Sequence, residues 1–321
     1  MARKLDADGQ IGQRLSLRDL HLFFTVVQHG SMAKAASQLG ISQPSVSEVI
    51  ANLEATLGAR LFDRRPRGVE PTMYGNALLT RTRAVFDELR QGIRDIESLA
   101  DPTGGEVRIG CSVAASVTFL RPVIHGFMEA FRGVVLRVAD VPFANYSGLG
   151  ERRHDLMLEW FVAPYTSELL GGEVKVEVLF EDDVVVVAGQ QTRWARRRKI
   201  DLAELTAERW ILGGPDTANY KDVTQAFRAR GLGMPNIALE SHSVSLRAYL
   251  LGASDFITAM PKSAASQLPV KILPVDLRVR PWPFAIFTLK NRTLSAAADS
   301  FIAHIRSFAR QQLSNRQTLR R

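Results

Sequence analysis

The sequence contains a single cysteine, Cys111, among 321 residues. One thiol cannot form a disulfide within the chain and is too few for a metal site built from thiolates. No apolar run approaches the roughly 20 residues that a membrane-spanning helix needs. The first 14 residues include no apolar segment of the kind found in signal peptides. We therefore expect a soluble, cytoplasmic protein that begins with a flexible arm over residues 1–16.

The sequence also lacks the common motifs of catalysis and nucleotide binding. It has no G-x-S-x-G elbow, no G-x-x-x-x-G-K-S/T loop, and no G-x-G-x-x-G after the first strand of its α/β region. Its six histidines form no pair at helical spacing that could bind a metal ion. We expect no enzyme, no metal site and no cofactor.

Basic residues outnumber acidic ones by 41 to 33, which gives a formal net charge of +8. This excess favours a polyanionic partner such as nucleic acid, although many basic proteins bind none. The basic run at 196–199 is either a contact for such a partner or a solvated surface. Hydrophobic residues make up 46% of the chain, so it can bury ordinary cores, and its length suits two or three domains.

Three helices are predicted near the N-terminus. Apolar residues recur at three- and four-residue steps over residues 17–27, which indicates one amphipathic helix. Ser31 and Ser42 are positioned to cap two further helices, separated by a turn at Gly40, with Pro44 in the first turn of the third. Two helices joined in this way form a helix-turn-helix, whose second helix enters the DNA major groove N-terminus first.

Residues 59–72 combine an apolar pair with a basic tip that contains proline and glycine, which is typical of a β-wing. The wing carries the arginines Arg60, Arg64, Arg65 and Arg67 around a single acidic residue, Asp63. Since affinity for duplex DNA comes mainly from neutralised phosphates, we expect the wing to clamp the DNA backbone. The alternative is a solvated loop.

Thr72 can cap a long helix that ends near Ala100. Its apolar positions recur every seven residues in two interleaved series: Leu79, Phe86, Ile93 and Ala100, then Thr82, Leu89 and Ile96. Such spacing predicts a coiled-coil seam between two protomers over residues 73–103. The alternative is a stripe that packs on the chain's own core, because Thr82 is a weak seam residue and Gly92 weakens the helix.

Residues 101–105, D-P-T-G-G, form the clearest linker, and strand-like and helical runs alternate beyond it. This alternation predicts an α/β fold with largely parallel sheets over residues 104–312, followed by a short tail at 313–321. A single strand-like run covers residues 178–188.

The segment from Ser31 to Ser47, S-M-A-K-A-A-S-Q-L-G-I-S-Q-P-S-V-S, resembles the LysR-type transcriptional regulators. The likeness continues through Leu53-Glu54, Leu57-Gly58, Leu61-Phe62-Asp63-Arg64, G-G-E-V-R-I-G at 104–110 and G-A-S-D-F-I-T-A-M-P at 252–261. It covers about residues 17–312, densely in the first 80. The family pattern often has arginine where this chain has Glu48, and this chain's N-terminal arm is longer than usual.

The resemblance implies a winged helix-turn-helix over residues 17–72, a linker helix, and an effector domain of two Rossmann-like α/β lobes, like a periplasmic binding protein. Lobe one would span residues 104–173 and 279–312, and lobe two residues 174–278. Family members form dimers or tetramers on partly palindromic promoter sites. They respond to a small, often anionic, metabolite, with an organic acid as one candidate.

The start of the third helix supplies the expected base contacts, because glutamine can bridge adenine and proline or serine can touch a thymine methyl. Ser42 either only caps this helix or also presents backbone N–H groups to phosphate. Glu48 either accepts from a cytosine amino group or is merely solvated. The expected DNA contacts are Ser31, Ser42, Gln43, Pro44, Ser45, Ser47, Glu48, Arg64, Arg65 and Arg67.

Ligands of α/β folds settle at the carboxyl ends of strands, near helix N-termini. Loops of this kind, and one aromatic side chain after a strand, supply the expected effector contacts Ser112, Ser116, Trp160, Ser241, His242 and Ser243. Alternatively, the serines only cap helices, the histidine is an ordinary surface residue and the tryptophan packs in a core. Cys111 either gates the pocket or fills space at a strand end.

Two other functions remain open at this point. A transport-type binding protein could use the same two lobes, but it would leave the N-terminal third unexplained. An architectural DNA-binding protein would keep the helix-turn-helix, and its effector domain would not respond to any ligand.

Overall fold

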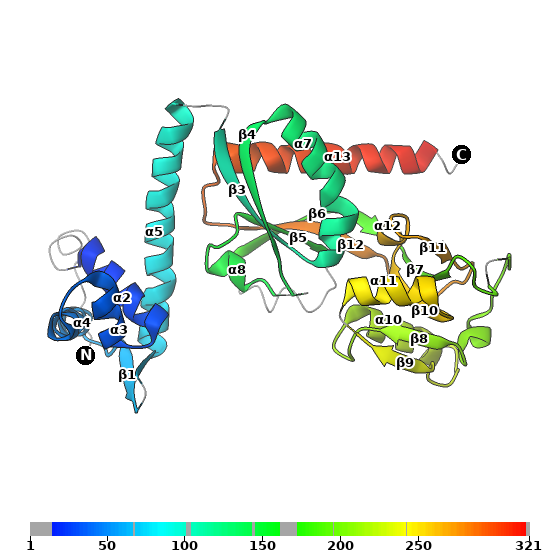
Figure 1. Ribbon diagram of the computed structural model, residues 1–321, viewed down its shortest axis with the longest axis horizontal. Helices are drawn as coiled ribbons and strands as arrows, with labels where there is room; N and C mark the ends of the chain where they lie inside the picture. Colours follow the sequence, from blue (N-terminus) through cyan, green and yellow to red (C-terminus); the bar gives the residue numbers. More distant parts are fainter. Residues whose placement is uncertain are drawn as a thin grey trace. The chain divides into compact units, whose positions relative to one another are not determined.

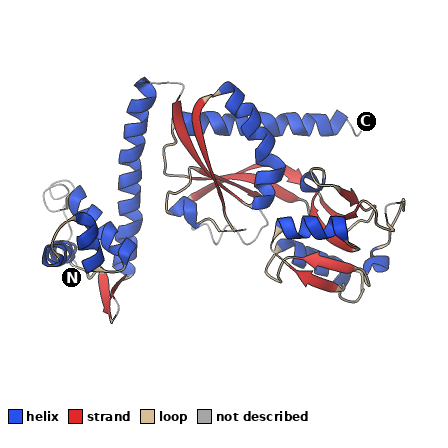
Figure 2. Cartoon of the chain, in the orientation of Figure 1, coloured by secondary structure: helices blue, strands red, loops and turns tan. Residues whose placement is uncertain are grey.

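The computed structural model describes residues 15–66, 68–100, 104–142, 145–160, 172–194, 196–241 and 243–318. The chain divides into two compact units, Met1–Ile93 and Arg94–Arg321. The first unit is helical apart from a two-stranded ribbon, and the second contains two sheets (Figures 1 and 2).

Three capped helices form the core of the first unit. They are α2 (Leu17–His29), α3 (Met32–Leu39) and α4 (Gln43–Leu57). Ser16, Ser31 and Ser42 cap them in turn, each accepting a hydrogen bond from a backbone N–H in the first turn. Ala35 and Ala36 are buried, and these small side chains let α3 pack closely against α2 and α4. The helix-turn-helix expected from the sequence is therefore present.

The ribbon expected after α4 is also present, as β1 (Phe62–Arg65) paired antiparallel with β2 (Gly68–Pro71). The Val69 N–H donates to the Gly30 carbonyl at 2.8 Å, so the ribbon is tied to the turn after α2. Gly68 has a φ of +147°, and a Cβ there would lie 2.1 Å from the Gly30 oxygen. Only glycine fits this close approach.

The long helix α5 (Met73–Ala100) follows the ribbon. Thr72 begins it as expected: its hydroxyl accepts from the Gly75 N–H at 3.1 Å and donates to the Arg60 carbonyl at 2.6 Å. The Glu54 carboxylate accepts from the Leu61 N–H at 2.7 Å, which fixes the connection from α4 into β1.

The first lobe of the second unit is built on a sheet with strand order β4-β3-β5-β12-β6. Its strands are β3 (Gly104–Cys111), β4 (Gly133–Asp140), β5 (Leu156–Trp160), β6 (Val174–Asp182) and β12 (Trp282–Leu289). Its helical segments are α6 (Val113–Ala115), a π-helical turn at Ser116–Leu120, α7 (Arg121–Ala130), α8 (Ser147–Gly150) and α13 (Ala296–Thr318).

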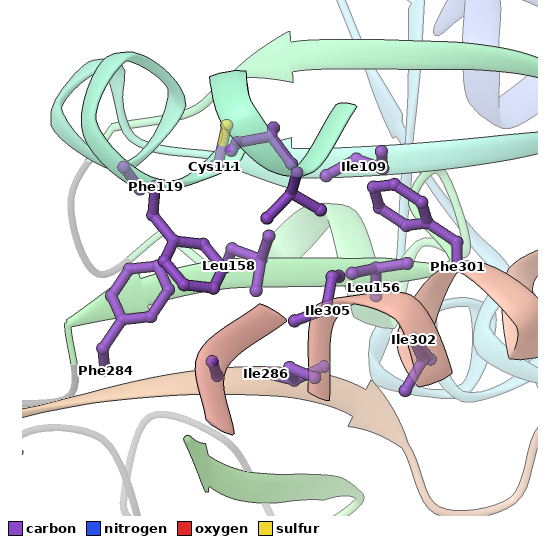
Figure 3. Packing of buried hydrophobic residues seen from close by; sticks show 14 of the residues in the cluster. Ile109, Cys111, Phe119, Leu156, Leu158, Phe284, Ile286, Phe301, Ile302 and Ile305 are labelled. Atoms are coloured by element: carbon purple, nitrogen blue, oxygen red, sulfur yellow. The ribbon is translucent and has the colours of Figure 1, made fainter. Parts of the chain in front are cut away.

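Side chains alternate between the two faces of this sheet. On one face Leu156 and Leu158 pack with Phe119 and with Phe301 and Ile305 of α13 (Figure 3). On the other face Met157 packs with Tyr146 and Leu149 near α8. The lobe is therefore a sheet covered by helices on both faces.

The second lobe repeats this plan with strand order β11-β7-β10-β8-β9. Its strands are β7 (Val184–Gly189), β8 (Arg209–Leu212), β9 (Ile237–Glu240), β10 (Phe256–Pro261) and β11 (Val270–Ile272). Its helices are a 3₁₀ turn at Leu202–Leu205, α10 (Ala218–Arg228), α11 (Val244–Ala253) and α12 (Lys262–Ala265). Phe227 of α10 covers one face and Leu251 of α11 the other.

The first boundary between the lobes differs from the expectation. We expected lobe two to begin at residue 174, but β6 pairs with β12 throughout and is the edge strand of lobe one. The chain crosses between Asp182 and Val184, in the middle of what the sequence presents as one strand-like run. Because such a run has the same alternation on either side of the crossing, its pattern could not locate the break.

The expectation of largely parallel sheets is also only partly right. In each lobe two of the four strand pairs are parallel: β3 with β4 and β5 in lobe one, and β8 with β9 and β10 in lobe two. The strands that join the lobes run antiparallel to their neighbours, as β12 does to β5 and β7 does to β10. They arrive from the other lobe rather than through a helix of their own lobe, so the right-handed crossover that makes neighbours parallel does not apply to them.

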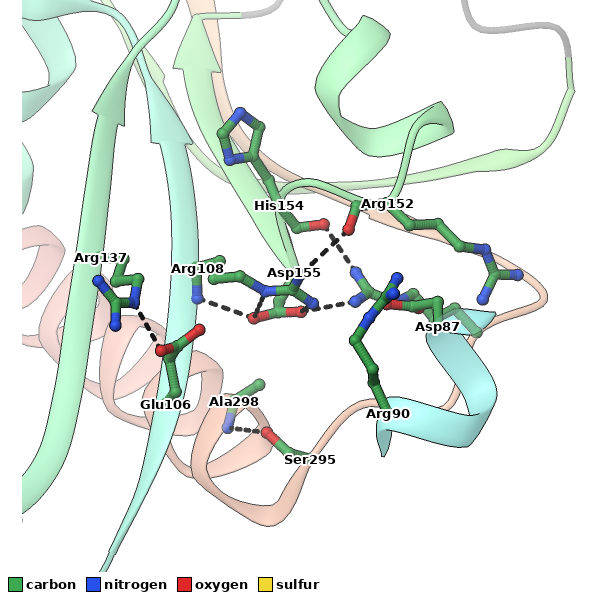
Figure 4. Close-up of polar contacts among 11 residues, drawn as sticks. Asp87, Arg90, Glu106, Arg108, Arg137, Arg152, His154, Asp155, Ser295 and Ala298 are labelled. Atoms are coloured by element: carbon green, nitrogen blue, oxygen red, sulfur yellow. Dashed lines mark hydrogen bonds and ion pairs between the residues drawn. The ribbon is translucent and has the colours of Figure 1, made fainter. Parts of the chain in front are cut away.

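A buried carboxylate fixes the start of β5 (Figure 4). Asp155 accepts from the Arg108 guanidinium at 2.8 Å, from the Arg108 N–H at 2.7 Å, and from Arg292 at 2.7 Å. Arg292 also donates to the His154 carbonyl at 2.7 Å. These contacts join β5 to β3 and to the segment after β12, and they set the position of the residues at the far end of β5.

Candidate functional site

Polar and exposed residues gather at the start of α4. Ser42 caps the helix, with its hydroxyl 3.2 Å from the Ser45 N–H and 2.8 Å from the Ser45 hydroxyl. Gln43, Pro44 and Ser45 are exposed, as is Glu48 one turn further on. These side chains form a solvent-facing surface at the N-terminal end of the second helix of the motif.

Two of the predicted contacts have structural roles as well. Ser31 caps α3 through the Lys34 N–H at 3.4 Å. Ser47 is half-buried, and its hydroxyl donates to the Met32 sulfur at 3.4 Å and accepts from the Gln43 amide at 3.3 Å. Ser47 therefore helps to seat α4 on α3 and orients the Gln43 side chain.

The wing, which follows α4 in the sequence, carries exposed arginines. Arg60 and Arg64 are exposed, and Arg65 is 3.2 Å from the equally exposed carboxylate of Glu70. A solvent-exposed pair of this kind contributes little stability, so it leaves Arg65 able to exchange Glu70 for a phosphate. Arg67 lies outside the described residues.

The apolar stripe of α5 divides into two parts. Leu79 is buried in the helix-turn-helix core, so the packing alternative holds there. Further along, Leu89, Ile93 and Ile96 are exposed to 46%, 57% and 70%, and Leu99 to 84%. This second part is an apolar ridge without a cover within the described chain.

A cavity of about 910 Å³ lies between the two lobes of the second unit. It is lined where strands end: Ser112 follows β3, Trp160 ends β5, and Ser241 follows β9. Its apolar wall includes Val113, Val117, Val141, Met260 and Leu268. The volume suits a small organic molecule, and the site lies where α/β sheets usually bind ligands.

The six predicted effector contacts do not all meet in this cavity. Ser112, Trp160 and Ser241 line it. Ser116 and Ser243 are not among its lining residues: the Ser116 hydroxyl donates to the Val113 carbonyl at 2.9 Å, and Ser243 caps α11. His242 lies outside the described residues. Helix capping accounts for what Ser243 does in the structure.

Trp160 serves the core and the cavity together. Its ring packs edge-on against Phe284, with 4.9 Å between centroids, and its indole N–H donates to Asp182 at 3.2 Å. Asp182 also accepts from the Ser263 N–H at 3.1 Å, so the network joins the two lobes at their crossing. Core packing is its main contact, yet part of the side chain borders the cavity.

Glu159 is a cavity residue that the sequence analysis missed. It is 2% exposed; its Oε1 accepts from the Ser112 hydroxyl at 3.1 Å and from the Trp160 N–H at 2.8 Å. Its Oε2 has no hydrogen-bond partner in the described structure. Burial raises the pKa of Glu159 from its ordinary value of 4.5 to about 7. Within L-M-L-E-W nothing distinguishes this residue from an outward-facing one.

Arg247 is the second cavity residue that was missed. It lies on α11, one helical turn beyond Ser243, and lines the cavity. Burial lowers the pKa of its guanidinium, although arginine keeps its charge in proteins. No hydrogen bond or ion pair of this side chain exists within the described chain. The sequence did hold a signal for this residue: Arg247 comes four residues after Ser243, the predicted helix cap, and so lies on the same side of the helix.

Cys111 is fully buried at the end of β3. Burial raises the pKa of its thiol to about 12, and the nearby carboxylates of Asp140 and Glu159 add to the shift. Since the thiolate is the reactive form, this cysteine is a poor nucleophile, and space-filling accounts for it.

Two family models match the chain. The model described as "Bacterial regulatory helix-turn-helix protein, lysR family" matches residues 17–76, and "LysR substrate binding domain" matches residues 100–310. Among the described residues, no helix is long and apolar enough to cross a membrane, and no group of His, Cys, Asp or Glu side chains could hold a metal ion.

Curated relatives agree with these models over nearly the whole chain. The transcriptional regulator GbpR of Azospirillum brasilense is 27% identical over 92% of this chain and 86% of its own. The regulator TdcA of Escherichia coli is 25% identical over 88% of this chain and 90% of its own.

Solved structures share the fold. One is full-length CbnR complexed with its target DNA, with a TM-score of 0.63, 20% identity and coverage of 92% of this chain and 100% of that one. Another is a full-length OxyR variant from Pseudomonas aeruginosa, with a TM-score of 0.65, 18% identity and coverage of 92% and 95%.

Proposed function

The chain belongs to the LysR family of bacterial DNA-binding transcriptional regulators, and from this we propose that a small organic acid, held between its lobes, controls its action at a promoter. The observation that carries the proposal is the interlobe cavity of about 910 Å³, with the unpaired guanidinium of Arg247 in its lining. An arginine fork matches the two oxygens of a carboxylate, and the pair is strongest where water is excluded.

The proposed base contacts lie at the start of α4. Gln43 has an amide that can bridge the N6 and N7 atoms of adenine, and Pro44 and Ser45 are exposed beside it. Glu48 is exposed on the same helix and can accept from a cytosine amino group. Ser31, Ser42 and Ser47 support this surface by capping and seating the helices, and the cap of Ser42 adds backbone N–H groups for a phosphate.

The proposed phosphate contacts lie in the wing. Arg64 and Arg65 are exposed, and Arg67 belongs to the same basic tip by its place in the sequence. Each neutralised phosphate steepens the salt dependence of binding by about 0.9 in the slope of log K against log salt. The wing thus supplies affinity that does not depend on base sequence.

The exposed ridge of α5 supports a homodimer. Leu89, Ile93 and Ile96 follow the spacing of a coiled-coil seam, Leu99 is exposed next to it in the sequence, and an apolar ridge of this kind needs a cover in water. A second copy of α5 would supply it, and a two-fold dimer matches a partly palindromic site. We propose that the chain works in this form, or as a tetramer of two dimers, in the cytoplasm where promoter DNA lies.

The test has two parts. Binding sites are first selected from fragmented genomic DNA and footprinted; a single protected sequence motif is expected. A panel of acids, including hexanoate, benzoate and succinate, is then added while DNA affinity is measured by fluorescence anisotropy. At least one acid should change the affinity of the wild type and not of Arg247→Gln.

The control for this test is Arg228→Gln, which removes an exposed arginine of α10 outside the cavity. It should keep the wild-type response. A protein that binds DNA but ignores every acid would instead be an architectural DNA-binding protein.

A further inference from the structure

The charged residues that line the interlobe cavity are divided by lobe. Within the described chain, lobe one contributes two carboxylates, Asp140 and Glu159, and no basic group. Lobe two contributes two cations, Lys221 and Arg247, together with the exposed Asp216. The cavity therefore has an acidic side and a mainly basic side, and both lobes add apolar residues to its wall.

The acidic side contains a carboxylate oxygen that lacks a partner. Glu159 is 2% exposed, and Ser112 and the Trp160 N–H both donate to its Oε1, whereas Oε2 receives no hydrogen bond in the described structure. A buried carboxylate oxygen left unpaired is costly, so such atoms are usually satisfied by a ligand, water or a proton. Burial raises the pKa of Tyr146, whose hydroxyl also has no partner in the described structure, and the carboxylate of Glu159 adds to the shift.

The basic side contains a guanidinium in the complementary situation. Arg247 has five donors and makes no hydrogen bond or ion pair within the described chain. The structure records no ion pair between Arg247 and Glu159, although both line the same cavity from opposite lobes. One oxygen of a buried carboxylate and a half-buried guanidinium of opposite charge are thus left without a partner within the described chain.

We propose that the effector is an amino acid in the broad chemical sense: a molecule with an acid group for Arg247, a nitrogen donor for Glu159, and an apolar body between them. This rests on the proposed function, which already places an organic acid in the cavity. The apolar wall, which includes Val117, Met260 and Leu268, would contact the body of the ligand. Such a ligand would contact both lobes and so stabilise one arrangement of them.

A simple acid fits the cavity less well. It would pair with Arg247 and leave Glu159 either unpaired or protonated. A protonated Glu159 would act as a donor, and glutamine would replace it without loss because its amide also donates. An ionised Glu159 that accepts from a ligand nitrogen cannot be replaced in this way. The Glu159→Gln variant therefore separates the two possibilities.

The experiment uses matched sets of ligands and the full chain. Each set holds an amino acid, the acid that lacks its nitrogen and the amine that lacks its acid group. Three sets cover short, long and rigid spacing: phenylalanine with 3-phenylpropanoate and 2-phenylethylamine, 6-aminohexanoate with hexanoate and hexylamine, and 4-(aminomethyl)benzoate with 4-methylbenzoate and 4-methylbenzylamine. Affinity is measured by calorimetry, and the change in DNA affinity by anisotropy.

At least one amino acid should bind about tenfold or more tightly than its matched acid and amine, as expected for one charge-assisted hydrogen bond. Glu159→Gln should remove this preference and leave the affinity for the acid unchanged. Arg247→Gln should weaken both the amino acid and the acid. Glu181→Gln changes an exposed glutamate of β6 outside the cavity and should leave every affinity at the wild-type value.

If the acids bind as tightly as their amino acids in all three sets, or if Glu159→Gln keeps the preference, the inference is wrong while the proposed acid sensor stands. If no compound binds and none changes DNA affinity, both the inference and the proposed sensor are contradicted.

Discussion

The proposed DNA-contacting surface and the interlobe cavity place their functional groups along the chain in opposite ways. At the start of α4 the residues are consecutive, and local capping fixes them: Ser42 ends the turn, and Gln43 to Ser45 follow at once. In the cavity, Glu159 and Arg247 come from different strands and helices of different lobes and meet only through the tertiary fold. The first surface depends on local structure, and the second depends on long-range contacts.

The largest effect that tests this contrast is expected on stability, from a change at Asp155, the buried carboxylate directly before β5. Asp155→Ala leaves the Arg108 and Arg292 guanidinium groups without their shared acceptor, and the Arg292 side chain is only 1% exposed. Removing one partner of a buried ion pair typically lowers the free energy of unfolding by about 3–5 kcal/mol. Urea denaturation followed by tryptophan fluorescence should show this loss in the effector domain.

The control is Glu129→Ala, which removes an exposed carboxylate 3.8 Å from His125 on α7 and should change stability by less than about 0.5 kcal/mol. Below the denaturation range, Asp155→Ala should keep its non-specific DNA affinity. If Asp155→Ala also lost non-specific DNA affinity under these conditions, the two regions would not be independent, and the contrast between them would be wrong.

The next effect concerns the pH dependence of folding. Between pH 4.5 and about 7 the unfolded chain loses the proton of Glu159 while the folded chain keeps it, so burial of this group lowers stability as pH rises. Below pH 4.5 the group contributes nothing. Above pH 7 the penalty should level off at about 3 kcal/mol, from 1.36 kcal/mol for each pH unit.

This penalty is measured as the difference in unfolding free energy between Glu159→Gln and the wild type, from urea titrations at pH 4, 5.5, 7 and 8. Glutamine should be the more stable form at pH 8 and equal to the wild type at pH 4. Glu181→Gln serves as the exposed control. Parallel stability curves for Glu159→Gln and the wild type would show that the buried carboxyl has its ordinary pKa.

A smaller effect is expected at the start of α4. Gln43→Ala should weaken binding to the selected DNA site by about 1–3 kcal/mol and weaken binding to random DNA less, because a bidentate base contact is sequence-dependent. Anisotropy titrations with the two DNAs measure the difference. Gln38→Ala, an exposed glutamine on α3, is the matched control. Equal losses on both DNAs would exclude Gln43 from base recognition.

The smallest effect should come from the wing. The double change Arg64→Gln and Arg65→Gln should weaken binding about tenfold at moderate salt, equally on specific and random DNA, because the wing reaches the same phosphates on both. The slope of log K against log salt should become shallower by about 0.9 for each phosphate that is no longer neutralised. A variant with an unchanged slope would mean that these arginines do not reach phosphate.

The contrast between the two regions also explains what could be predicted from sequence. The caps at Ser31, Ser42 and Thr72 were recognisable because their signals lie within a few residues of the structure they cause. The helix-turn-helix, the wing and the long helix were therefore predicted correctly. So was the family, since the resemblance is densest in this region.

The cavity was predicted only in part. Ser112, Trp160 and Ser241 were found because they follow strands, which is a local signal, but the same signal also selected Ser116 and Ser243, which do not line the cavity. Glu159 resembles any outward-facing residue of a strand until the fold buries it. The chain's crossing near Asp182 was misplaced for the same reason, since only pairing with β12 shows which sheet β6 joins.

DNA contact at α4 and ligand sensing at the interlobe cavity should be separable properties of the one chain. DNA affinity measured with and without a bound ligand, for Gln43→Ala and Arg247→Gln in parallel, tests this directly. Gln43→Ala should lose specific affinity yet still respond to the ligand, whereas Arg247→Gln should keep basal affinity and lose the response. Loss of both properties in both variants, or a full response in Arg247→Gln, would contradict this separation.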